Sequence, residues 1–264
     1  MYVNAAQLFL WDQRTLFIGS LSDKIELSQG AATLTVSLGE PLLFQTPSMA
    51  RPIATRSILL PPSLDIEVDT RGSIIANCNL DPLLKDWFGL HHSMLHHEYG
   101  LSYELDNEEW VIGQFQTIHQ QQLGYVDAYR LLEGLLNTAK GKVLTERKLD
   151  PRIETVINHI KDSVDDNVSV EALAAKVNLS APRLIQIFKQ QTGVPIRRYR
   201  QWHRLYTTAV EMGKGVTLTE AALHAGFSDS AHFTNTFKSM LGMKPSDVLS
   251  QSQGIRIYTP EIDH

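Results

Sequence analysis

The sequence predicts an α+β protein of two domains, in which a β-rich front part is followed by helices and then by an all-α back part. Three observations support this prediction. Short strands with period-two alternation reach to about residue 78, helical periodicity takes over after it, and the back part contains an internal repeat of helical segments. At roughly 150 residues per domain, the length of 264 residues also favours two domains.

The front part begins as a series of short strands. Residues 33–38 alternate apolar and polar side chains, and the turn-forming residues 39–41 end that run. Residues 53–60, 66–68 and 73–78 continue the pattern between further turns. Several short strands at this spacing predict an antiparallel sandwich or barrel. Its interior either holds a small ligand or is filled by side chains.

After Asn79 the periodicity predicts helices. Asp81 and Pro82 are a helix-start signal, and two longer amphipathic helices lie on either side of Gly124. Their apolar positions are Trp110, Ile112, Phe115 and Ile118 in the first, and Val126, Tyr129, Leu132, Leu135 and Leu136 in the second. Such broad faces must be buried, either on the sheet or in a dimer interface, and the sequence leaves both open.

Residues 91–97 contain four histidines, of which His92 and His96 have the i, i+4 spacing that lets two imidazoles share a metal ion. Glu98 is the only carboxylate close by, so a solvated helix or loop is favoured over a metal site. Cys78 has no adjacent lysine or arginine to activate it and is expected to be a small buried residue. We therefore predict no metal and no cofactor.

Composition excludes several classes of protein. A hydrophobic fraction of 43% with 20% charged residues is ordinary for a globular chain. One cysteine cannot form an intrachain disulfide, which argues against a secreted disulfide scaffold. We identify no signal-peptide pattern and no apolar run long enough for a membrane helix. The sequence thus predicts a cytoplasmic protein without a membrane partner.

The net charge of −5 is an average over two different parts. Residues 1–145 hold 16 acidic and 9 basic residues, whereas residues 170–250 hold 5 acidic and 10 basic residues. A basic back part is compatible with a nucleic-acid partner, although the whole chain is acidic.

The back part repeats itself. Residues 170–180 match residues 218–228 at an offset of 48, and after one inserted residue the match continues at an offset of 49. Each copy predicts a short helix, a tight turn and a second helix. Ser169 and Thr217 are the expected caps of the first helices, and Asn178 and Gly226 are the expected turn residues. This is the pattern of a helix-turn-helix.

A long helix is predicted between the copies, over residues 195–212, with Ile196, Tyr199 and Leu205 facing inward. This helix would hold the two motifs apart, so that their second helices enter successive major grooves about 34 Å apart. Residues 140–150 are charged and weakly patterned, and they end at a second helix-start signal, Asp150-Pro151, so we place the domain boundary there.

From about residue 153 to 249 the sequence resembles the DNA-binding domain of AraC/XylS-family transcriptional regulators. The residues that carry the resemblance are Arg204-Leu205, Ala209, Leu218, Ala221-Ala222, Gly226-Phe227-Ser228, Phe233, Phe237-Lys238, Gly242 and Pro245. The resemblance implies an N-terminal cupin-like β-barrel with appended helices, for sensing and dimerisation. We accordingly expect that domain over residues 1–140 (strands to about 78, helices after), a linker over 141–150, the DNA-binding domain over 151–250 and a tail over 251–264.

The resemblance assigns base reading to the exposed face of the second helix in each motif. The candidates are Pro182, Arg183, Ile185 and Gln186 in the first motif, and Ser230, Ala231, His232, Thr234 and Asn235 in the second. Arg183 can pair with guanine, and Gln186 and Asn235 can pair with adenine. The phosphate-contact candidates are Ser180, Lys189, Arg197, Arg198, Arg200, Ser228 and Lys238.

These features together predict a sequence-specific transcriptional regulator, with activation as the usual behaviour of the family it resembles. Double-stranded DNA is the expected partner, and we expect a homodimer. The resemblance also admits RNA polymerase and an unidentified small-molecule effector as partners. Catalysis is not expected, because residues 7–78 contain no histidine to serve as the inward metal ligand of a cupin-like site.

Overall fold

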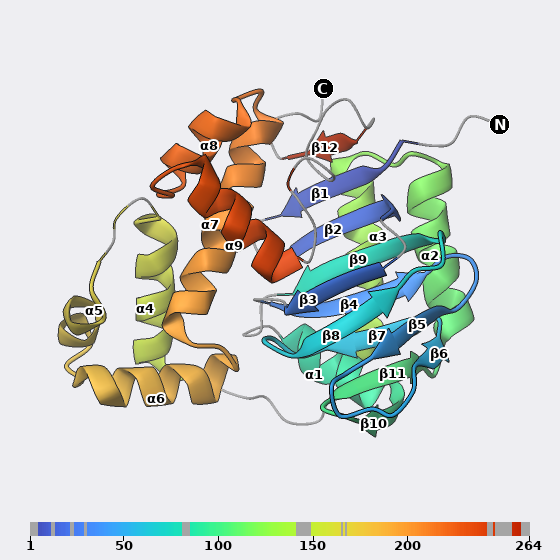
Figure 1. Ribbon diagram of the computed structural model, residues 1–264, viewed down its shortest axis with the longest axis horizontal. Helices are drawn as coiled ribbons and strands as arrows, with labels where there is room; N and C mark the ends of the chain where they lie inside the picture. Colours follow the sequence, from blue (N-terminus) through green and yellow to red (C-terminus); the bar gives the residue numbers. More distant parts are fainter. Residues whose placement is uncertain are drawn as a thin grey trace.

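The computed structural model describes residues 5–11, 14–21, 24–28, 31–80, 85–140, 149–164, 166, 168–241, 245 and 255–259. Two sheets form its N-terminal part (Figure 1). The larger sheet has the strand order β10 (Met94–Glu98), β11 (Leu101–Leu105), β7 (Ser57–Leu60), β4 (Ala32–Ser37), β9 (Ile74–Leu80), β2 (Arg14–Ser20), β1 (Gln7–Trp11) and β12 (Arg256–Tyr258). The smaller sheet has the order β3 (Lys24–Ser28), β8 (Asp65–Asp69), β5 (Leu42–Gln45) and β6 (Ile53–Thr55).

The prediction of a barrel is wrong in one respect, since strand pairing among the described residues leaves two separate sheets rather than a closed barrel. One core fills the space between the smaller sheet and the β7 end of the larger one, where Leu42, Phe44, Ile58 and Ile66 are buried. The front part is therefore held together by side-chain packing between the sheets and not by continuous backbone pairing.

Helices α2 (Glu108–Gln120) and α3 (Tyr125–Lys140) pack on the larger sheet. Their apolar faces are therefore buried on the sheet, which is one of the two alternatives that the sequence left open. Phe115, Leu132 and Leu136 are fully buried against Leu16, Ile18 and other residues of the sheet. Trp110 and Val126, which the periodicity places on the apolar faces, are instead 44% and 46% exposed. They lie near the beginnings of their helices, where the apolar stripe leaves the core.

The expectation of helices alone after residue 78 is also corrected. Helix α1 (Lys85–His92) is followed by the hairpin of β10 and β11. Tyr99 and Gly100 form its two-residue turn with positive φ angles of 53° and 81°, the backbone that tight hairpins require. The proposed helix start at residues 81–82 lies outside the described residues.

The back part is helical, with α4 (Pro151–Asp162), α5 (Val170–Lys176), α6 (Ala181–Thr192), α7 (Ile196–Gly213), α8 (Leu218–His224) and α9 (Ser230–Leu241). Several predicted caps are confirmed. The Asp150 carboxylate accepts from the Arg152 N–H, the Ser169 hydroxyl accepts from the Ala172 N–H, and Thr217 forms a capping box with Glu220. Residues 141–148 of the predicted linker lie outside the described residues. Within the part of the chain that is described, no helix is long and apolar enough to cross a membrane.

The larger sheet is covered on both faces at its β1 and β2 end. Phe9 and Leu16 point to the core beneath α2 and α3, whereas Leu8, Leu10 and Phe17 share a second core with α7, α8 and α9. This arrangement explains the unbroken apolar run of β1, because successive side chains of a strand point to opposite faces and both faces are buried. Figure 1 shows α9 lying between α7 and the sheets.

Candidate nucleic-acid interface

Helices α5 and α6 form the first helix-turn-helix. Asn178 takes a left-handed φ of 54° at its turn, as the sequence predicts. In α6, Leu184 and Phe188 are fully buried, while the four base-reading candidates Pro182, Arg183, Ile185 and Gln186 are all exposed. An exposed face of this composition offers a guanidinium, an amide and two apolar side chains to the outside.

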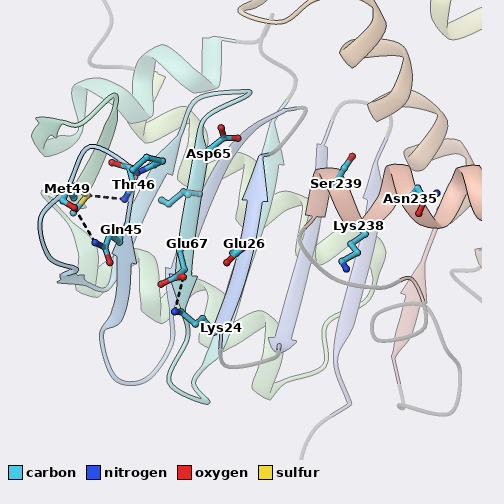
Figure 2. A pocket seen from close by; sticks show the side chains of 12 residues that line it. Lys24, Glu26, Gln45, Thr46, Met49, Asp65, Glu67, Asn235, Lys238 and Ser239 are labelled. Atoms are coloured by element: carbon cyan, nitrogen blue, oxygen red, sulfur yellow. Dashed lines mark hydrogen bonds and ion pairs between the residues drawn. The ribbon is translucent and has the colours of Figure 1, made fainter.

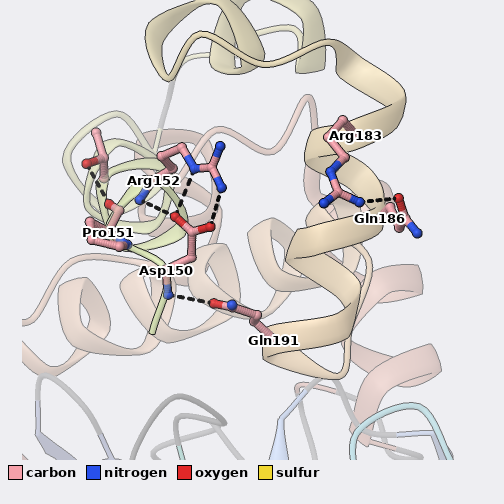
Figure 3. A network of polar contacts seen from close by, with 7 residues as sticks. Asp150, Pro151, Arg152, Arg183, Gln186 and Gln191 are labelled. Atoms are coloured by element: carbon pink, nitrogen blue, oxygen red, sulfur yellow. Dashed lines mark hydrogen bonds and ion pairs between the residues drawn. The ribbon is translucent and has the colours of Figure 1, made fainter. Parts of the chain in front are cut away.

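The exposed face of α6 carries one internal hydrogen bond. Arg183 Nη1 donates to Gln186 Oε1 at 2.9 Å, so each side chain holds the other in place (Figure 3). Both groups keep further polar atoms that can bond to a base edge.

A polar network fixes α4 against α6 (Figure 3). The Asp150 N–H donates to Gln191 Oε1 at 2.8 Å, and Arg152 donates to both oxygens of the Asp150 carboxylate. The hydrogen bonds from Arg152 lower the pKa of Asp150 to about 2, so the carboxylate is charged at neutral pH. The network thus sets the position of the first motif without using its outward face.

Helices α8 and α9 form the second helix-turn-helix. Gly226 provides the turn with a φ of 81°, and the Asp229 carboxylate accepts from the His232 N–H at 2.7 Å and thereby caps α9. Among the base-reading candidates, Ser230, Ala231, His232 and Asn235 are exposed and Thr234 is half-buried. His232 is also held at its ring, since Nδ1 lies 3.2 Å from Ser228 Oγ.

The phosphate-contact candidates separate into two groups. Ser180, Lys189, Arg197, Ser228 and Lys238 are exposed. Arg198 and Arg200 are half-buried, and burial lowers the pKa of both guanidinium groups. Arg200 donates to the Val168 carbonyl, and its neighbour on α7, Arg204, donates to the Val164 carbonyl at 3.1 Å. These two arginines therefore hold the segment between α4 and α5, a role that only the tertiary contacts identify.

A cleft of about 900 Å³ separates α9 from the smaller sheet. Asn235, Lys238 and Ser239 lie on its α9 side, while Lys24, Glu26 and Glu67 lie on the strands opposite (Figure 2). Lys24 Nζ is 2.8 Å from Glu67 Oε2, and that contact raises the pKa of Lys24. Sequence reasoning missed this cleft, because its two walls come from segments that are at least 168 residues apart in the chain.

The histidine-rich segment does not assemble a metal site, since the described residues contain no group of three histidine, cysteine or carboxylate side chains placed to hold an ion. The His91 and His97 rings stack at 4.4 Å, and His96 contacts Glu104 at 3.2 Å. His91 and His92 lie at the end of helix α1, in agreement with the expected helix, whereas His96 and His97 lie on strand β10 and not in a helix or loop. Cys78 is fully buried as predicted, and burial raises the pKa of its thiol to about 12.

Comparisons with known proteins agree with this geometry. A family model described as a helix-turn-helix domain matches residues 173–251. Over 138 residues the chain is 30% identical to the XylDLEGF operon transcriptional activator 2 of Pseudomonas putida, covering 51% of this chain and 87% of that protein. It is 31% identical over 104 residues to the HTH-type transcriptional activator RhaS of Escherichia coli, covering 39% of this chain and 37% of that protein. The chain thus matches little more than a third of the length of RhaS.

Solved structures show a similar fold over almost the whole chain. ToxT from Vibrio cholerae has a TM-score of 0.60 at 14% identity, covering 89% of this chain and 96% of that one. A ToxT structure with an unsaturated fatty acid bound has a TM-score of 0.58 at 14% identity, covering 90% and 95%. At this identity the likeness concerns the fold alone.

Proposed function

Because the chain belongs to the AraC/XylS family of transcriptional regulators, we propose that it binds specific DNA sequences and activates transcription from nearby promoters. The observation that carries this proposal is the pair of helix-turn-helix motifs, whose helices α6 and α9 each present exposed side chains that can bond to base edges. We propose residues 151–250 as the DNA-binding domain and residues 1–140 as a cupin-like sensing and dimerisation domain.

Residues of both motifs have defined roles in this proposal. Pro182, Arg183, Ile185, Gln186, Ser230, Ala231, His232, Thr234 and Asn235 are the base-reading candidates. Ser180, Lys189, Arg197, Ser228 and Lys238 are phosphate-contact candidates supported by their exposure, and half-buried Arg198 remains a candidate. Arg200 is assigned a structural role instead, because its guanidinium already donates to the Val168 carbonyl.

Arg183→Ala is expected to weaken binding to the selected DNA site by about 1–3 kcal/mol and to relax sequence preference at one base pair. The site is obtained by selecting the full chain against a random-sequence duplex pool, and affinities are measured by fluorescence anisotropy at several salt concentrations. Lys189→Ala should instead weaken binding to all duplexes alike and reduce the salt dependence. Failure of the selection to enrich any duplex would contradict sequence-specific binding.

We further propose that an effector acts at the cleft between α9 and the smaller sheet, since a molecule there would touch both parts of the protein. A ToxT structure contains an unsaturated fatty acid. In this chain, however, three carboxylates (Glu26, Asp65 and Glu67) and two lysines (Lys24 and Lys238) line the cleft, beside apolar Met49 and Ile66. Because the carboxylates outnumber the lysines, this lining favours an amphiphile with a cationic head group.

Oleylamine is therefore expected to raise the melting temperature of the protein and to change its DNA affinity more than oleic acid does, which has the same chain and the opposite charge. Glu26→Gln should reduce this difference, whereas Glu133→Gln on α3, away from the cleft, should leave it unchanged. Equal changes in melting temperature and DNA affinity with the two amphiphiles would argue against the cleft as the effector site. A difference between the amphiphiles that Glu26→Gln does not alter would argue against it as well.

The remaining parts of the proposal concern the working state. We propose that the protein acts in the cytoplasm, where a single free cysteine stays reduced, and that it acts as a homodimer that contacts RNA polymerase. Relatives named as transcriptional activators support the contact with polymerase. The family is one of regulators, so no reaction is assigned to the chain.

A further inference from the structure

The C-terminal segment of the chain returns to the N-terminal sheet. Strand β12 pairs with β1 in parallel, with Gln7 opposite Arg256 and Phe9 opposite Tyr258, and the Arg256 N–H donates to the Ala6 carbonyl at 2.8 Å. Without β12, strand β1 would be the edge of the larger sheet, with its outer backbone groups unpaired. The last described residues of the chain thus complete a sheet formed by the first ones.

The side chains of β12 belong to two cores at once. Tyr258 stacks on Phe9 with ring centroids 4.5 Å apart and planes 13° apart, within the core beneath α2 and α3. Ile255 and Ile257 pack on the other face, in the core that joins Leu8 and Phe17 to α7, α8 and α9. Because neighbouring side chains of a strand point to opposite faces, one short strand links the N-terminal core to the second helix-turn-helix.

This attachment fixes the position of α9. Ile255 and Ile257 pack in the same core as Phe233, Phe237 and Met240 of α9, so the pairing of β12 with β1 keeps α9 against the larger sheet. The apolar contacts of Leu8, Leu10 and Phe17 with helices α8 and α9 also hold α9 against the larger sheet. Residues of β12 and of β1 and β2 therefore act together in one core to hold the second helix-turn-helix on the N-terminal part.

The held position is unfavourable for DNA at α9. A helix seated in a major groove, which is about 12 Å wide, has a phosphate backbone on each side. Here Asn235 and Lys238 face a wall that carries three carboxylates, Glu26, Asp65 and Glu67, and one lysine, Lys24, which pairs with Glu67. Glu26 and Glu67 are register partners in β3 and β8, so both carboxylates stand on one face of the smaller sheet. A phosphate backbone beside α9 would be repelled by that face.

We propose that β12 is an intramolecular clasp, which keeps the second helix-turn-helix against the N-terminal sheets and whose release from β1 frees α9 for DNA. In the clasped state α6 meets a duplex without obstruction, whereas the exposed side chains of α9 lie beside the Glu26 and Glu67 carboxylates, and release removes that neighbouring charge. The effect on DNA rests on the proposed function, whereas the clasp itself is a property of the protein alone.

The first test needs no DNA. Arg256→Pro removes the N–H that donates to Ala6, and Arg256→Ala keeps it while removing the same exposed side chain. Amide hydrogen exchange of the full chain should be faster in β1 and α9 for Arg256→Pro only. Equal exchange in the two variants would overturn the clasp.

The second test locks the clasp. Leu8 and Ile257 are register partners, and neighbouring strands lie about 4.8 Å apart, within the range of Cα separations that a disulfide bridges. Leu8→Cys with Ile257→Cys should form this bond on oxidation. The native Cys78 is fully buried and is expected to stay out of the reaction.

On a duplex selected with the wild-type chain, the oxidised double variant should bind about tenfold more weakly than its own reduced form, a difference of about 1.4 kcal/mol. Equal affinities of the oxidised and reduced forms would overturn the clasp as a control of DNA binding. If no form binds any duplex, the proposed function fails and the hydrogen-exchange comparison alone decides whether the clasp exists.

Discussion

Arg14→Ala is expected to lower the free energy of unfolding by about 3–5 kcal/mol, because it leaves a buried carboxylate without its countercharge. Arg14 lies on β2 and Asp86 on α1, and their side chains are 4% and 0% exposed. Arg14 Nε donates to Asp86 Oδ2 at 2.7 Å and Nη2 donates to Oδ1 at 3.2 Å, while Nη1 donates to the Tyr129 hydroxyl on α3. One guanidinium therefore joins three elements of the N-terminal part.

The pKa of Arg14 depends on two opposing effects, its burial and its contact with Asp86. Burial acts to lower it, but the hydrogen bond and the charge of Asp86 raise it above its ordinary value. Arg14 remains charged at any pH at which the protein is folded, so the cost of the substitution does not come from a titration of Arg14.

Urea unfolding followed by circular dichroism measures the loss of unfolding free energy in Arg14→Ala. Arg130→Ala is the matched control, because Arg130 pairs with Asp127 on the surface, where the two side chains are 73% and 65% exposed, and it should cost less than about 1 kcal/mol. Arg14→Met combined with Asp86→Leu should recover most of the stability, since no buried charge remains. If Arg14→Ala lowered the free energy of unfolding no more than Arg130→Ala does, the buried pair would not stabilise the N-terminal part.

Phe233→Ala is expected to cost about 3–5 kcal/mol and to remove the contribution of α9 to DNA binding. Phe233 is 1% exposed, and its ring centroid lies 5.2 Å from that of Phe227 and 5.6 Å from that of Phe237. The substitution leaves a cavity in the core that holds α9 to α7 and α8. Loss of this packing should loosen α9 as a whole.

Leu223→Ala, in the same motif but with Leu223 49% exposed, should change stability by no more than about 0.5 kcal/mol. Unfolding in urea and hydrogen exchange in α9 give the comparison, and anisotropy with the selected duplex gives the effect on DNA binding. Phe233→Ala with normal stability and reduced DNA affinity would contradict a core role and indicate that the ring contacts bases directly.

Local features of this protein were predictable from its sequence because they depend on residues close together in the chain. The repeat placed both helix-turn-helix motifs, and the positive φ angles of Asn178 and Gly226 and the caps at Ser169 and Thr217 agree with it. A cap or a tight turn is decided by hydrogen bonds within four residues, so it can be predicted from the sequence without knowledge of the tertiary contacts.

Two features of the fold differ from the sequence prediction or lie beyond it. The β10–β11 hairpin is compatible with residues 94–105, where a two-residue turn at Tyr99 and Gly100 separates the strands, but the sequence predicts helices after residue 78. Arg200, a phosphate-contact candidate because of its place on a helix, donates to a loop carbonyl 32 residues away, a contact that only the fold creates.

The family, the two motifs and the α+β order of the chain follow from local periodicity and from matches between segments of the sequence. The pairing of Arg14 with Asp86, the acidic wall opposite α9 and the closure of the sheet edge at β1 by β12 are visible only in the folded protein. These contacts depend on burial and strand pairing, which join residues 72 to about 250 positions apart. No periodicity along the chain records which distant faces cover one another.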